Sequence, residues 1–90
     1  MKTREEVLRD IEDAKTLTGE YLKTYTGDPS LAWVSGELNR LAALVQKTWP
    51  LSKADRDTIY LGVYAAKNLD ELDNAKLAIK LSHIDADLKR

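Results

Sequence analysis

Apolar residues recur every three or four positions along most of the chain, which is the spacing of an amphipathic helix. No segment sustains the alternation of apolar and polar residues that a half-buried strand needs. The pattern predicts four helices, over about residues 4–25, 29–48, 53–67 and 71–88. Because the connections are short, successive helices should pack antiparallel. We therefore expect an all-α fold, a compact antiparallel bundle of four helices, in a single helical domain spanning residues 1–90.

A residue that can cap a helix stands just before each predicted helix. A Ser, Thr or Asp side chain there accepts a hydrogen bond from a first-turn amide that has no partner within the helix. The candidate caps, each with the residue that supports it, are Thr3 with Glu6, Asp28 with Pro29, Ser52 with Asp55, and Asp70 with Asp73. In the last case we expect Asp70 to cap the fourth helix and Asp73 to occupy its third position.

Each predicted helix carries one apolar stripe, and the four stripes together should form the core. The members are, in chain order, Val7, Ile11, Ala14, Thr18, Tyr21 and Tyr25; Leu31, Val34, Leu38, Leu41, Val45 and Trp49; Ile59, Val63 and Ala66; and Leu77, Leu81, Ile84 and Leu88. Gly62 lies beside the third stripe, inside a predicted helix. We expect it to mark a close contact between two helices rather than a turn.

Composition excludes several classes of function. The chain has 14 basic and 15 acidic residues and a net charge of -1, without the basic excess typical of nucleic-acid binders. It has no cysteine, so it can form neither a disulfide nor a thiolate metal site. Its one histidine, His83, lies off the apolar stripe and is expected at the surface, and its glycines form no phosphate-binding loop. We therefore predict a protein that is not an enzyme and needs no metal or cofactor.

The sequence gives no sign of a membrane span or a signal peptide. The longest unbroken apolar run, Leu41 to Val45, is far shorter than the roughly 20 residues that a transmembrane helix requires. The first ten residues are charged where a signal peptide would be apolar. The expected location is the cytoplasm, without a membrane partner.

The remaining chemistry is that of binding. Tyrosine and tryptophan are enriched at the energetic centres of protein interfaces, and the chain has four and two of them. Trp33, Tyr60 and Tyr64 lie off the main stripes, so a core position and a surface position stay open for each. Acidic residues open the fourth predicted helix. Acidic and aromatic groups together suit a basic groove on a partner, because charge steers the encounter and the rings anchor it.

A stretch from Ile59 to Asp73, continued through Leu81, carries a motif. Its elements are Leu61-Gly62, Ala65 or Ala66 followed by Lys67, Leu69, Asp70-Glu71 and Asp73, and a weaker match precedes it at Tyr25, Gly27, Leu31 and Leu38. On these residues the chain resembles a small all-helical family of type VI secretion immunity proteins, which neutralise NAD(P)+ glycohydrolase effectors. The resemblance implies a protein that binds one cognate toxin domain and blocks its access to NAD+ without chemistry of its own.

On this hypothesis the toxin-binding residues are expected to be Trp33, Tyr60, Tyr64, Lys67, Asp70, Glu71 and Asp73. The alternative is a homo-oligomeric helical adaptor or regulatory protein. In that case a second copy would cover the apolar residues beside the stripes, which are Leu17, Leu44, Leu72 and Ile79. A metal- or nucleotide-dependent enzyme is a third hypothesis, against which the missing motifs argue.

Overall fold

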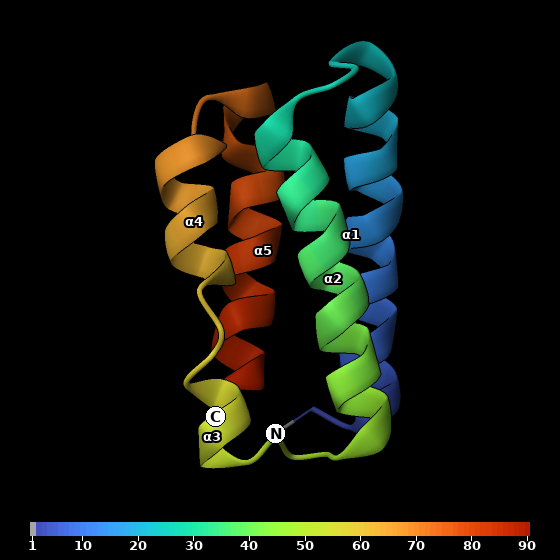
Figure 1. Cartoon of the computed structure of the whole chain (residues 1–90), viewed down its shortest axis with the longest axis vertical. Helices are drawn as coiled ribbons and strands as arrows, with labels where there is room; N and C mark the ends of the chain where they lie inside the picture. The colour runs from blue at the N-terminus through green and yellow to red at the C-terminus, as the bar shows by residue number, and fades with distance from the viewer. Residues whose placement is uncertain (1) are drawn as a thin grey trace.

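The computed structural model describes residues 2–90, and within this range the chain forms helices and no strands (Figure 1). The α-helices are α1 (Arg4–Thr24), α2 (Pro29–Lys47), α3 (Lys53–Arg56), α4 (Leu61–Asn68) and α5 (Lys76–Leu88), and a 3₁₀ turn, η1 (Leu72–Ala75), precedes α5. The four longer helices run alternately up and down and form a bundle of 34 × 20 × 19 Å. The predicted fold class is confirmed.

Helices α1 and α2 begin where the sequence predicts. Thr3 and Glu6 form the capping box: the Thr3 hydroxyl accepts from the Glu6 amide at 3.2 Å, and the Glu6 carboxylate accepts from the Thr3 amide at 3.1 Å. These bonds lower the pKa of Glu6. At the start of α2, Asp28 accepts from the amides of Ser30 and Leu31 at 2.9 and 3.1 Å. Both helix starts are therefore held by side chains two or three residues away in sequence.

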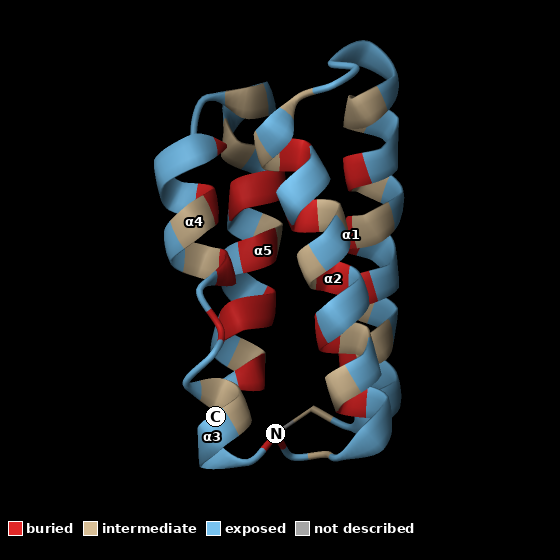
Figure 2. Ribbon diagram, viewed as in Figure 1, coloured by how far each residue is buried: buried red, intermediate tan, exposed pale blue. Residues whose placement is uncertain are grey.

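The core lies between the four long helices, where their buried faces meet (Figure 2). Three of the predicted stripes supply it, with Val7, Ile11, Ala14, Leu31, Val34, Leu38, Leu41, Val45, Leu77, Leu81, Ile84 and Leu88 each at most 2% exposed. Tyr21 and Trp49 pack partly buried against this core, as expected. Tyr25 does not, because it follows the last turn of α1 with a non-helical backbone and is exposed.

The prediction of a continuous helix over 53–67 is wrong in its middle. Ser52 caps α3 as expected, but the chain leaves the helix after Arg56 and α4 begins only at Leu61. Ile59 is buried in the connection, and the restart changes which positions face the core. Leu61, Ala65 and Leu69 are buried in α4 and just after it, whereas Val63 and Ala66, which the sequence predicts as core, are exposed.

The expected start of the fourth helix is also wrong. Asp73, Asn74 and Ala75 have φ values of 49°, 56° and 63°, so they form a left-handed turn, and α5 begins at Lys76 without a side-chain cap. Asp70 and Asp73 are therefore not capping residues of α5. A left-handed backbone costs a non-glycine residue about 1–2 kcal/mol. Partial burial of Leu72 and Ala75 against the core, and a bond from Tyr21 to Asp73, offset this cost.

Candidate functional site

An aromatic pair, Trp33 and Tyr64, joins α2 to α4. The two rings are stacked, with centroids 3.9 Å apart and an angle of 26° between their planes. Trp33 is exposed and Tyr64 is half-buried, so the pair presents apolar surface beside the core. Such a pair contributes about 0.5–1.5 kcal/mol beyond the area it buries. The structure thus brings together two of the residues that the sequence singles out, although they lie in different helices.

One edge of α4 carries Tyr60, Tyr64 and Lys67. Their spacing of four and then three residues puts them on the same side of a helix. Tyr60 precedes the first turn of α4, makes no capping bond with its side chain and is 62% exposed. Lys67 is exposed in the last turn. Tyr60 and Lys67 are therefore available to a partner, whereas Tyr64 is half-buried and also packs against the core.

An acidic turn, made of Asp70, Glu71 and Asp73, follows α4. All three residues are exposed. The Tyr21 hydroxyl donates a hydrogen bond of 2.6 Å to the Asp73 carboxylate, which ties this turn to α1. Partial burial of the hydroxyl, together with this bond to a carboxylate, raises the pKa of Tyr21 to about 12. Asp73 therefore has a structural partner, whereas Asp70 and Glu71 present their charge to solvent.

A groove of about 560 Å³ lies between α3, the start of α4 and the end of α5. We call it the α3–α4 groove, and its lining residues are Lys53, Arg56, Asp57, Ile59, Tyr60, Val63 and Lys89. Of the seven toxin-binding residues predicted from the sequence, only Tyr60 lines this groove. The prediction missed the groove because a continuous helix over 53–67 leaves no opening there and turns Val63 towards the core.

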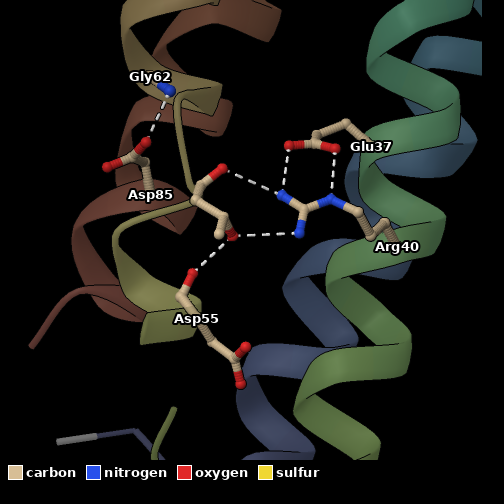
Figure 3. Close-up of polar contacts among 6 residues, drawn as sticks. Glu37, Arg40, Asp55, Gly62 and Asp85 are labelled. Carbon is tan, nitrogen blue, oxygen red and sulfur yellow. Dashed lines mark hydrogen bonds and ion pairs between the residues drawn. The ribbon is translucent and has the colours of Figure 1, made fainter. Parts of the chain in front are cut away.

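The connection between α3 and α4 is held in place from two sides (Figure 3). Arg40 of α2 donates from its guanidinium to the hydroxyl and the carbonyl of Thr58, both at 3.2 Å. Two bonds of 2.8 Å to Glu37 orient the guanidinium and raise the pKa of Arg40. From α5, the Asp85 carboxylate accepts from the Gly62 amide at 2.8 Å. The break in the helix is thus a fixed feature of the fold.

Gly62 makes the close contact that the sequence predicts, but in the first turn of α4. A Cβ at this position would lie 3.3 Å from three atoms of the Asp85 side chain. Asp85 is buried and also pairs with Lys89, one helical turn later, at 3.0 Å. Because Tyr60 offers no capping side chain, Asp85 takes the place of a cap for α4. The contact fixes α4 against α5. It thereby also fixes where α4 presents Tyr60, Tyr64 and Lys67.

The other candidate residues are accounted for as follows. His83 is exposed, as predicted. Of the four apolar residues that a second copy would cover, Leu17, Leu44 and Leu72 pack partly buried against the core and Ile79 is exposed. Within residues 2–90, no His, Asp and Glu side chains gather in a group of three that could hold a metal ion. Over the same stretch, none of the helices combines the length and apolar character needed to cross a membrane.

The chain matches the model of a known protein family. The family model described as Tsi6 matches residues 6–90, which include all seven predicted binding residues and every helix from within α1 onwards. Neither the curated proteins nor the solved structures gave a match. The match therefore covers nearly the whole chain, well beyond the stretch that carries the motif.

Proposed function

The chain belongs to the Tsi6 family of type VI secretion immunity proteins, and on this premise we propose that it binds a cognate NAD(P)+ glycohydrolase-type toxin domain and blocks its active site. The observation that carries the proposal is the family match over residues 6–90. The complex is one-to-one and forms in the cytoplasm. The chain acts by obstruction, so it carries out no reaction and needs no metal, cofactor, nucleic acid or membrane.

The proposed binding surface consists of the aromatic pair, the outward edge of α4 and the acidic turn. Its residues are those expected from the sequence: Trp33, Tyr60, Tyr64, Lys67, Asp70, Glu71 and Asp73. The stack supports this proposal because it holds two large rings at the surface in a fixed arrangement, which reduces the entropy lost on binding. The exposed carboxylates of Asp70 and Glu71 provide charge that steers a basic toxin surface into place.

Alanine substitutions at Tyr64 and Asp70 test this surface. Each should weaken binding of the toxin domain by more than about tenfold if it is one of the few residues that dominate an interface. The affinity is measured by titration calorimetry with the purified cognate toxin domain. Since Asp70 caps no helix, its replacement should leave the melting temperature nearly unchanged. Unchanged affinity in both variants would show that the toxin binds elsewhere.

The Tyr64 variant needs a control, because its ring also packs against the bundle. Tyr64→Phe keeps the stacking surface and removes only the hydroxyl. It should bind nearly as well as the unmodified chain if the ring is the anchor. A melting curve for each variant separates lost binding from lost folding. Weak binding by Tyr64→Phe at an unchanged melting temperature would assign the contact to the hydroxyl instead.

A further inference from the structure

We propose that the α3–α4 groove is a second contact site for the toxin, and that it receives an acidic side chain of the toxin together with an adjoining apolar one. The inference rests on the proposed function, because the toxin domain is its ligand. It goes beyond the surface predicted from the sequence, which meets the groove only at Tyr60. The groove also differs in charge from the acidic turn, so it selects a different part of the partner.

Charge around the groove favours an acidic occupant. Three cationic side chains line it, and only one carboxylate does. Lys53 pairs with Asp57 at 3.1 Å, and Lys89 pairs with Asp85 at 3.0 Å. Arg56 makes no ion pair with any residue in the range 2–90. Its guanidinium can therefore bind a carboxylate of the toxin through two parallel hydrogen bonds.

The apolar part of the groove is exposed and lies beside this guanidinium. Tyr60 is 62% exposed and Val63 is 54% exposed, although both are large side chains next to the core. Tyrosine and arginine are among the residues most enriched where binding energy concentrates. An apolar side chain next to the toxin carboxylate would cover Tyr60 and Val63 and remove water from the ion pair. This exclusion of water strengthens the attraction between the two charges.

The groove is already formed in the free chain. Arg40 holds Thr58 on one side and Asp85 holds Gly62 on the other, so the backbone between α3 and α4 is fixed before a partner arrives. A preformed site loses less entropy on binding than a mobile one. This break exposes Tyr60 and Val63, and contacts from α2 and α5 hold it in place. Such an irregularity is more typical of a binding surface than of a packing defect.

One partner can cover this groove and the aromatic pair together. The eight residues of α4 extend over about 12 Å. A standard interface buries about 800 Å² on each partner, which corresponds to a patch about 30 Å across. Both regions lie along α4, so both fit within such a patch. The toxin would then meet positive charge at one end of α4 and negative charge at the other, and this fixes its orientation.

A charge reversal at Arg56 tests the inference. Arg56→Glu and the milder Arg56→Gln are compared with the unmodified chain by calorimetric titration against the same toxin domain. Arg9→Glu is the matched control, since it makes the same charge change at an exposed position of α1 that does not line the groove. Arg56→Glu should weaken binding at least tenfold and Arg56→Gln somewhat less, whereas Arg9→Glu should change affinity by less than about twofold. Reversing the matching toxin carboxylate to lysine should restore binding to Arg56→Glu.

The outcomes separate this inference from the proposed function. If the unmodified chain binds the toxin and both Arg56 variants bind equally well at unchanged melting temperatures, the groove is not a contact and the proposed function stands. If the unmodified chain forms no complex with the toxin, both fall together. Sedimentation of the chain alone tests whether a second copy of the chain, rather than the toxin, occupies the groove. A dimer that Arg56→Glu dissociates would show that a second copy occupies the groove, and this would overturn the inference.

Discussion

The two halves of the bundle differ in helix length and in how their helices begin. Helices α1 and α2 are 21 and 19 residues long, begin at side-chain caps and bury a regular apolar stripe. From Lys53 onwards the chain forms α3, α4, η1 and α5, which are 4, 8, 4 and 13 residues long. In this half, neither α4 nor α5 begins at a side-chain cap of its own. Contacts from distant helices hold it in shape instead.

This structural difference agrees with the different roles that we propose for the two halves. The first half provides a regular frame, and the second half carries six of the seven predicted binding residues and the α3–α4 groove. Local irregularity in an otherwise regular protein is expected at functional positions, because a binding surface must expose side chains that the core would otherwise bury. Trp33 is the exception in the first half, and it stacks on Tyr64 of the second.

The largest expected loss of stability comes from replacing core leucines, and these variants test whether the two halves share one core. Leu38 of α2 and Leu81 of α5 are both fully buried. Replacing either by alanine should lower the free energy of unfolding by about 2–5 kcal/mol, because each change removes buried methyl groups and leaves a cavity. Denaturation followed by far-ultraviolet circular dichroism and by tryptophan fluorescence should give one shared transition. Separate transitions for the two signals would show that the halves unfold independently.

A smaller effect compares the caps of the two halves. Asp85→Ala should cost about 1.5–3 kcal/mol, because it leaves the Gly62 amide without its charged acceptor. Asp28→Ala should cost about 1 kcal/mol, the usual loss for a local cap. Urea denaturation of the purified variants measures both free energies of unfolding and checks these expectations.

The two variants should also differ in binding. Asp85→Ala loosens α4 against α5, so it should weaken toxin binding under conditions in which the chain is still folded. Asp28→Ala should leave binding unchanged, because its helix carries only Trp33 of the proposed surface. Equal binding by both variants would contradict the role given to Asp85 in positioning α4.

The smallest effect concerns the bond between Tyr21 and Asp73, which joins the halves at the acidic turn. The pKa of Tyr21 is raised from 10.0 to about 12, so the folded state holds this proton more tightly than the unfolded state. The resulting stabilisation is complete below pH 10 and is lost as the pH rises towards 12. Absorbance of the tyrosinate ion during an alkaline titration should show one tyrosine ionising late. Tyr21→Phe should remove this late step, and its persistence would assign the raised pKa to another tyrosine.

Sequence and structure agree where local signals decide the outcome. The starts of α1 and α2 follow from Thr3 and Asp28, whose partners lie within three residues. The stripes of α1, α2 and α5 follow from helical spacing, and they supply most of the core. The resemblance carried by residues between Ile59 and Asp73 agrees with the family match over residues 6–90.

The sequence does not predict the features that depend on contacts between residues far apart along the chain. The break between α3 and α4 contains neither proline nor glycine, and its holding contact, from Arg40 to Thr58, spans 18 positions. The contact of Gly62 with Asp85 spans 23, and that of Tyr21 with Asp73 spans 52. No local pattern reports such pairs. The α3–α4 groove and the left-handed turn therefore emerge only in three dimensions.

We propose that this chain inhibits a toxin by obstructing its active site. The most direct test measures NAD+ consumption by the purified toxin domain while the chain is added in increasing amounts. We predict that turnover falls to zero near one equivalent, and that the chain alone consumes no NAD+. Full toxin activity at a saturating dose, or consumption of NAD+ by the chain itself, would rule out inhibition by obstruction.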